Sequence, residues 1–340
     1  MNAAGAGDVL LEVEDLAVEF RTEAGVVHAV DGLSYTVSAG RTLAIVGESG
    51  CGKSVSSLAV MGLLGPTARV TRGAVRFRGN NLLALGVKER RAFAGEHVAM
   101  VFQDALAALN PVHTVGYQLG EALRVRRGVG RAEARRRAIE LLDSVRVPRA
   151  ADRIGDYPHQ FSGGMRQRVM IAAALAMDPQ VLIADEPTTA LDVTVQAQIL
   201  RLLAEIQAER QMGLVLITHD LGVVASVADD VTVMYAGHAV EQATVHEIFA
   251  APAHPYTRAL LRAMPAMAGG TADKARGGRL AVIPGRPARP GPIAVGCPYH
   301  PRCDAARDMC RTMAPPVVAL PGGRGSRCHF ATEVLEAVGV

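Results

Sequence analysis

The chain has 340 residues, of which 49% are apolar and 20% charged, a composition typical of a globular protein with a sizeable core. Its formal net charge of +3 gives no strong case for a nucleic-acid-binding surface. The longest apolar stretch, near Val169–Met177, is far shorter than the roughly 20 residues that cross a bilayer, and Met1–Asp8 lacks the segments of a signal peptide.

Short apolar runs recur along the chain, and helical patterns lie between them. One such pattern places Val195, Ile199, Leu202 and Ile206 at spacings close to 3.6 residues. This alternation predicts an α/β fold with a mostly parallel sheet covered by helices on both faces. The runs that indicate strands are Leu43–Val46, Val98–Phe102, Val181–Ala184, Leu214–Ile217 and Val231–Tyr235.

Two segments depart from this alternation. Residues from about 104 to 178 are Arg-rich and helix-forming, and they predict a helical subdomain inserted into an α/β domain of residues 1–250. Residues 265–296 are rich in Gly, Pro and Arg, which indicates a linker or an extended arm. We expect residues 251–340 to form a C-terminal extension that ends in a small Cys-containing module.

A glycine-rich loop follows the first predicted strand and precedes a helical pattern. It fits G-x-x-x-x-G-K-[ST] in full, a loop whose N–H groups and helix N-terminus bind phosphates. We expect Lys53 to reach the β- and γ-phosphates of ATP and the Ser54 hydroxyl to ligate Mg²⁺. The loop consists of Gly47, Glu48, Ser49, Gly50, Cys51, Gly52, Lys53 and Ser54.

Two carboxylates follow the apolar run at Val181–Ala184. Ligands bind at the C-terminal edge of such sheets, so Asp185 suits Mg²⁺, directly or through water, and Glu186 suits polarisation of an attacking water. The alternative is a strand followed by a solvated acidic turn. His219 follows another strand at the same edge, where it could hydrogen-bond the γ-phosphate, although a lone histidine is most often structural.

Further motifs, in the expected order, make the chain resemble the ABC ATPases. Gln103 matches their Q-loop, Ala190-Leu191-Asp192 their D-loop and His219 their switch histidine. The resemblance implies a P-loop NTPase core that hydrolyses ATP with Mg²⁺. It also implies that Gln103 contributes to the Mg²⁺ and nucleotide site and connects the helical insert to the catalytic core.

A fourth match is the segment Phe161–Met165. It is similar to the ABC signature motif, which usually reads Leu-Ser-Gly-Gly-Gln, and it departs from that motif at its first and fifth positions. The core of Ser162, Gly163 and Gly164 is intact, so we expect its function to survive. In this family the motif binds the γ-phosphate of ATP held by a second subunit, so the resemblance implies a dimer with an identical or paralogous ATPase.

The C-terminal part narrows the resemblance. His254-Pro255-Tyr256-Thr257, followed by Leu260, is similar to the extension of ATPases from dipeptide and oligopeptide importers, including relatives that carry nickel. This implies a peripheral protein on the cytoplasmic face of the inner membrane, bound to two transmembrane permeases and, through them, to an extracytoplasmic peptide-binding protein.

Other functions stay open as alternatives. The chain could be the ATPase subunit of an importer of nickel or another small solute. The C-terminal extension disfavours an ATPase subunit of an exporter. A soluble ABC ATPase that acts on nucleic acid is disfavoured by the single phosphate loop and the short insert, so no nucleic-acid partner is expected.

Four of the five cysteines are close together in the C-terminal module, with the spacing C-x5-C-x6-C-x17-C. In a cytoplasmic chain, where disulfides are rare, such a group favours metal binding. The spacing fits neither the usual zinc pairs nor the tighter ferredoxin runs. The resemblance to peptide importers implies a [4Fe–4S] cluster, with zinc or unligated thiols as alternatives. The four residues are Cys297, Cys303, Cys310 and Cys328.

Overall fold

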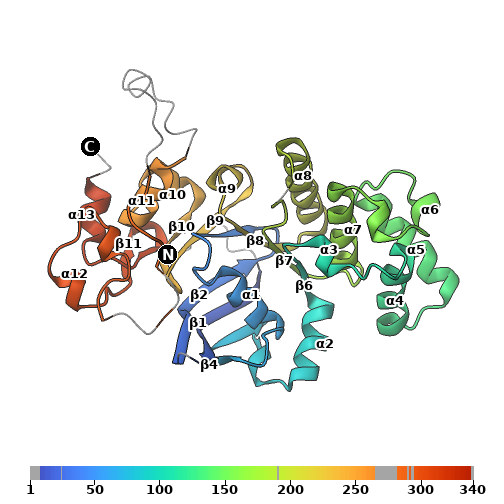
Figure 1. Ribbon diagram of the computed structural model, residues 1–340, viewed down its shortest axis with the longest axis horizontal. Helices are drawn as coiled ribbons and strands as arrows, with labels where there is room; N and C mark the ends of the chain where they lie inside the picture. Colours follow the sequence, from blue (N-terminus) through green and yellow to red (C-terminus); the bar gives the residue numbers. More distant parts are fainter. Residues whose placement is uncertain are drawn as a thin grey trace. The chain divides into compact units, whose positions relative to one another are not determined.

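In the computed structural model, the chain divides into two compact units. Figure 1 shows the helices and strands of the described residues. The first unit holds residues up to 10, 37–41 and 85–215, and the second holds residues 11–36, 42–84 and 216 onward. Much of the predicted linker lies outside the described residues. The residues described are 8–23, 25–189, 191–264, 282–288, 291 and 295–337.

The second unit contains a mixed sheet that carries the predicted phosphate loop. Its order is β11-β12-β10-β9-β3, followed by the second half of β8. β3 pairs with β9 in parallel, whereas β10, β11 and β12 form antiparallel pairs. The C-terminal strands therefore extend the sheet that supports the loop. The strands are β3 (Thr42–Val46), β8 (Gly213–Thr218), β9 (Asp230–Tyr235), β10 (His238–Thr244), β11 (Val318–Leu320) and β12 (Arg324–Ser326).

A second sheet of this unit is antiparallel, with the order β2-β1-β4-β5, and was not predicted. β1 and β4 pair from Leu11↔Phe77 to Phe20↔Ala68, with a shift in register after Glu14. Alternate residues near the end of β2 are buried, so one face of the sheet covers the core. The strands are β1 (Val9–Thr22), β2 (Gly25–Ser38), β4 (Ala68–Phe77) and β5 (Asn80–Asn81).

The hydrophobic core of the second unit joins distant parts of the sequence. Val46 of β3 and Val231 and Tyr235 of β9 share one buried cluster with Tyr256 and Tyr299 from the C-terminal part. The extension therefore packs into the core beneath the phosphate loop. The helices of this unit are α1 (Lys53–Met61), α9 (Leu221–Val227), α10 (Val245–Ala250), α11 (Pro255–Arg262), α12 (Met309–Thr312) and α13 (Ala331–Glu336), with 3-10 turns η1 (Leu82–Ala84), η5 (His300–Arg302) and η6 (Pro321–Gly323).

The first unit combines buried strands with a helical segment. β6 (Val98–Val101) and β7 (Val181–Asp185) pair in parallel, and the first half of β8 lies beside β7. Between residues 104 and 178 the described elements are all helical. The helices of this unit are α2 (Val87–His97), α3 (Ala105–Ala108), α4 (Val115–Arg127), α5 (Arg131–Ser144), α6 (Ala150–Arg153), α7 (Gly163–Leu175) and α8 (Val193–Arg210), with η2 (Pro158–Gln160).

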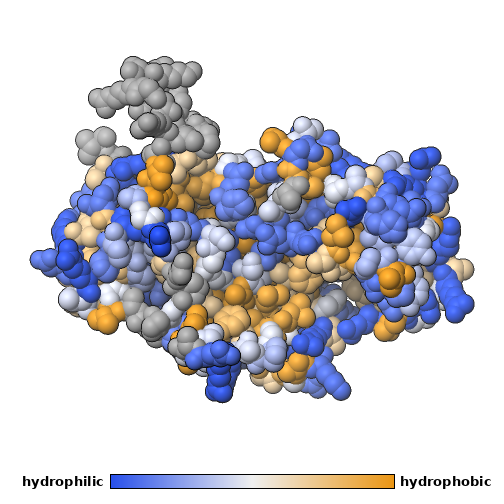
Figure 2. Space-filling view, viewed as in Figure 1, coloured by the Kyte–Doolittle hydropathy of each residue, from blue (hydrophilic) through white to orange (hydrophobic). Residues whose placement is uncertain are grey.

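The predicted strands agree with the structure. Each of the five apolar runs is a strand whose ends differ from the prediction by no more than one residue. Among the described residues, no helix combines the length and the apolar composition that a membrane span requires. Hydrophilic residues cover much of the face shown in Figure 2, with apolar residues between them.

Candidate nucleotide-binding site

The phosphate loop, Gly47–Ser54, connects two elements of the second unit. All residues of β3 are buried, and Gly52 caps the N-terminus of α1 with a φ of 105°. A Cβ at Gly52 would lie 2.3 Å from the carbonyl oxygen of Ala29, and a Cβ at Gly47 would lie 2.2 Å from that of Met234. Only glycine allows backbone segments to approach so closely. The glycines of the motif are therefore required by the fold of the loop.

Lys53, the first residue of α1, lies inside this loop and is 5% exposed. Its Nζ donates hydrogen bonds to the carbonyl oxygens of Gly47 at 2.7 Å and Glu48 at 3.0 Å, and contacts the Cys51 Sγ at 3.9 Å. A thiol is a weak acceptor, so a phosphate oxygen can replace that contact. The ammonium group and the helix N-terminus thus provide positive charge at one place, with the partly buried Ser54 next in the helix.

The predicted acidic residues follow β7 in the first unit. Asp185 is 5% exposed, and Glu186 has a φ of 45°, a left-handed conformation that is uncommon outside glycine and is enriched at functional sites. The Glu186 Oε2 accepts hydrogen bonds from Gln103 Nε2 at 3.1 Å and from Thr189 Oγ1 at 2.9 Å. The structure thus brings together Gln103 and Glu186, which the sequence predicts for the site. It also places Thr189 there, a residue that the sequence analysis did not single out and that could be suspected only from its hydroxyl group three residues after Glu186.

The predicted signature segment starts a helix in the first unit. Ser162 is the N-cap of α7, and its side chain does not cap the helix. The first N–H groups of a helix have no partners within it, which makes them available to an anion. A Cβ at Gly164 would lie 2.5 Å from Val195 Cγ1 of α8, so this glycine permits close packing of α7 against α8.

One arginine contacts both positions at which the segment departs from the usual motif. The Arg153 guanidinium lies over the ring of buried Phe161, at 4.4 Å from its centroid, and its Nη1 is 3.3 Å from Met165 Sδ. Its Nη2 donates to the carbonyl oxygen of Gln160 at 3.1 Å. The cation–π contact requires an aromatic face, which leucine lacks. Phe161 and Met165 thus hold Arg153 against the turn that precedes Ser162.

The remaining predicted motif residues lie at ends of elements. His219 directly follows β8, with an exposed side chain, and Asp220 caps α9. Asp192 of the D-loop caps α8, whereas Ala190 lies outside the described residues. The phosphate loop and His219 belong to the second unit, and Gln103, Ser162, Gly163, Gly164, Asp185 and Glu186 belong to the first.

The cysteine module, residues 295–337, brings the four predicted cysteines to one small cavity. Their thiols are free, and three histidines line the same cavity. Burial raises the pKa of the Cys303 and Cys328 thiols to about 11, so ligation would have to displace their protons. The donor type and number suit a [4Fe–4S] cluster. Within the described ranges, however, no three Cys, His, Asp or Glu side chains are arranged to hold a metal ion.

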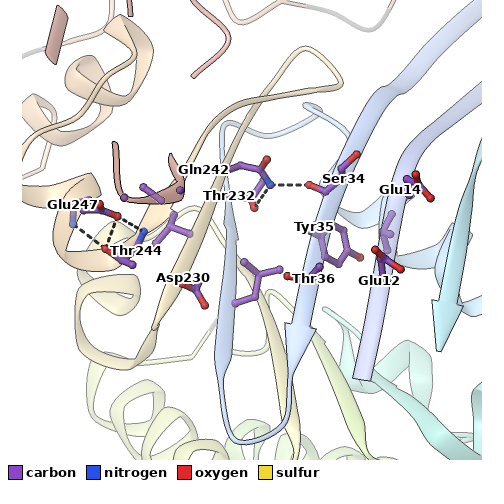
Figure 3. A pocket seen from close by; sticks show the side chains of 16 residues that line it. Glu12, Glu14, Ser34, Tyr35, Thr36, Asp230, Thr232, Gln242, Thr244 and Glu247 are labelled. Carbon is purple, nitrogen blue, oxygen red and sulfur yellow. Dashed lines mark hydrogen bonds between the residues drawn. The ribbon is translucent and has the colours of Figure 1, made fainter. Parts of the chain in front are cut away.

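Another cavity of the second unit lies between β1, β2, β9 and β10 (Figure 3). Carboxylates line it, among them Glu12, Asp230 and Glu247, and Tyr35 contributes a buried hydroxyl that has no hydrogen-bond partner among the described residues. It contains none of the residues that the sequence predicts for nucleotide binding. The candidate nucleotide site is therefore defined by the motif residues rather than by this cavity.

Two protein families match the chain in succession. The family described as ABC transporter matches residues 30–189, and the family described as Oligopeptide/dipeptide transporter, C-terminal region, matches residues 240–310. The structure is also similar to the dimeric structure of MJ0796, a bacterial ABC transporter cassette, with a TM-score of 0.63 and 26% identity, over 69% of this chain and 99% of the other. These matches define the class of protein as an ABC ATPase.

Curated relatives give the group within that class. The Escherichia coli K12 protein named dipeptide transport ATP-binding protein DppD is 52% identical over 94% of this chain and 96% of its own length. A Brucella abortus protein named putative peptide import ATP-binding protein is 49% identical over 94% of both chains. The chain therefore belongs to the ABC transporter ATP-binding proteins of the oligopeptide/dipeptide type.

Proposed function

We propose that this chain is the ATP-hydrolysing subunit of an ABC importer of dipeptides or oligopeptides. The observation that carries the proposal is the joining, in one chain, of the nucleotide motifs and a C-terminal region of the oligopeptide/dipeptide type. The relatives named above for dipeptide transport and peptide import are matched over nearly their full length. Import of nickel or another small solute remains the alternative, since selectivity in such systems lies in the binding protein and the permeases.

The nucleotide-binding roles follow from the chemistry of each side chain. Lys53 would contact the β- and γ-phosphates, with the N–H groups of the phosphate loop around them. Ser54, Asp185 and Gln103 supply oxygen ligands, which Mg²⁺ prefers. The buried position of Lys53 and its contacts with the carbonyl groups of the loop support this assignment.

Hydrolysis requires a base and a contact with the γ-phosphate. Glu186 would polarise the attacking water, and Gln103 and Thr189 hold its carboxylate in one orientation. His219 would hydrogen-bond the γ-phosphate. Ser162, Gly163 and Gly164 would bind the γ-phosphate of ATP held by a second ATPase subunit, as the helix N-terminus at Ser162 allows.

The proposed function also implies partner proteins. The solved relative MJ0796 is described as dimeric, which supports a dimer for this chain with an identical or paralogous subunit. Peptide import would place the dimer on the cytoplasmic face of the inner membrane, bound to two permeases and served by an extracytoplasmic binding protein.

Purification of the tagged chain from membranes is expected to recover two polytopic permeases. Proteoliposomes are then prepared that contain the chain, the permeases and the binding protein. In these, the dipeptide Ala-Ala or a pentapeptide should stimulate ATP hydrolysis more than Ni²⁺ does, because ATP hydrolysis is coupled to transport of the proposed cargo. The permeases without this chain are the control. Stimulation by Ni²⁺ alone would show that the cargo is nickel and not a peptide. Recovery of ribosomes or DNA with the tagged chain would contradict the proposed importer function.

For the cysteine module, we propose that the four cysteines hold one [4Fe–4S] cluster with a structural role. Four thiols around one cavity supply the donor set of such a cluster, and ATP hydrolysis itself needs no redox chemistry. The module is small, and a cluster would tie its turns together as metals do in other small modules.

Protein purified without oxygen is expected to be brown, with broad absorbance near about 400 nm, and to contain iron and acid-labile sulfide. Cys303→Ser should loosen the module and lower assembly with the permeases, because one ligand is lost. Cys51→Ser is the matched control, since Cys51 lies in the phosphate loop and should leave the iron content unchanged. Colourless anaerobic protein with one zinc per chain would reject the cluster and favour zinc.

A further inference from the structure

The first variable residue of the phosphate loop, Glu48, is held by an arginine of the cysteine module. Arg302 Nη1 lies 2.6 Å from Glu48 Oε2, and Arg302 Nη2 lies 2.9 Å from Glu48 Oε1. The two residues are 254 positions apart in the sequence and both belong to the second unit. This two-bond contact between planar groups fixes both distance and orientation.

The pair is shielded from solvent. The side chain of Arg302 is 5% exposed and that of Glu48 is 22% exposed. Arg302 is also fixed from its own side, because its Nε donates to the carbonyl oxygen of Pro284 at 2.9 Å and its guanidinium lies 5.8 Å from the ring centroid of Tyr235. The guanidinium is therefore oriented for Glu48 by contacts that do not involve the loop.

A second contact from the C-terminal part holds the backbone of the same residue. The Glu48 N–H donates to the hydroxyl of Tyr256 at 3.1 Å, and the Glu48 carbonyl oxygen accepts from Lys53 Nζ at 3.0 Å. Tyr256 is fully buried and packs against Tyr235 and Tyr299, with ring centroids 4.7 Å and 5.3 Å apart. Glu48 is thus a junction between the C-terminal part and the lysine of the loop.

We propose that Arg302 is a positioning residue for nucleotide binding, which fixes Glu48 and neutralises its carboxylate within the loop that receives the phosphates. Without the guanidinium, the negative charge of Glu48 would oppose the polyanionic phosphates, and the turn that orients Lys53 would loosen. Because Arg302 directly precedes Cys303, the cysteine module contributes to ATP affinity as well as to its own fold. This inference rests on the proposed binding of ATP at the phosphate loop.

The test compares MgATP dissociation constants, measured by titration calorimetry on the full chain. Arg302→Met should weaken binding about tenfold, which corresponds to about 1.4 kcal/mol. Arg302→Lys keeps the charge but loses the fork, so it should weaken binding only about threefold. Adding Glu48→Gln to Arg302→Met should recover most of the affinity, because the unpaired carboxylate is then absent.

Arg324→Met is the matched control for a structural effect. Arg324 is also a buried arginine of the cysteine module, 7% exposed, and it pairs with fully buried Glu241 of β10. Its loss should lower the unfolding temperature yet leave the ATP affinity of the folded protein unchanged.

Each outcome is decisive. Wild-type affinity in Arg302→Met overturns the inference, and so does a failure of Glu48→Gln to restore binding. An equal loss of affinity in Arg302→Met and Arg324→Met also overturns it, because the arginine would then act through stability alone. Absence of ATP binding in the wild-type chain would instead contradict the proposed function.

Discussion

Glu186→Gln is expected to slow ATP hydrolysis by roughly 10²–10⁴-fold while MgATP still binds, because the amide keeps the shape of the side chain but cannot act as a base. Glu186 Oε2 accepts hydrogen bonds from both Gln103 and Thr189. The carboxylate that the substitution removes is therefore held in place by the fold. An ATP-bound dimer should accumulate. Phosphate release measures the rate, and size-exclusion chromatography with ATP measures the dimer.

The control for this substitution is Glu205→Gln. Glu205 lies on α8 in the same unit and belongs to none of the motifs, and its exposed side chain pairs with Arg146. The Glu205→Gln variant should hydrolyse ATP at the wild-type rate. If Glu186→Gln retains turnover within a few-fold of wild type, Glu186 is not the base.

Lys53→Ala is expected to weaken MgATP binding by roughly a hundredfold or more, because it removes the ammonium group that we propose forms charge-assisted hydrogen bonds to the phosphates. The substitution also removes the bridge from Nζ to the carbonyl oxygens of Gly47 and Glu48, so the loop loses an internal support. Equilibrium titration with a fluorescent ATP analogue measures the affinity.

Lys88→Ala is the control, since Lys88 is an exposed lysine on α2 and outside the motifs. Its affinity for the analogue should equal that of the wild type. An unchanged dissociation constant in Lys53→Ala would refute the assignment of Lys53 to the phosphates, provided that the variant unfolds cooperatively at a similar temperature.

The buried strands could be predicted because each is a short, continuous apolar run. β7 and β8 are buried throughout, so nearly every residue carries the signal. The antiparallel sheet of β1, β2 and β4 was missed because its strands are half exposed. The register shift in β1 after Glu14 also interrupts the alternation of apolar and polar residues that would have indicated it.

In the candidate site, too, the features set by neighbouring residues could be predicted, whereas contacts between residues far apart in the sequence could not. The phosphate loop is contiguous, and its chemistry follows from residue types at fixed spacing. Gln103 and Glu186 could be singled out by motif, but their hydrogen bond joins residues 83 positions apart and required the structure. The pairing of Glu48 with Arg302 has no local signal, because the packing of the C-terminal part against the loop decides it.

The contacts of Arg153 with Phe161 and Met165 restrict how the signature segment can vary in evolution. Arg153 needs the aromatic face of Phe161 and lies against the Met165 sulfur, so the three side chains form one packing unit. A lineage that restored leucine at position 161 would leave the guanidinium over a face with no π electrons. The two departures from the usual motif are therefore not independent steps, and natural sequences should change them together with position 153.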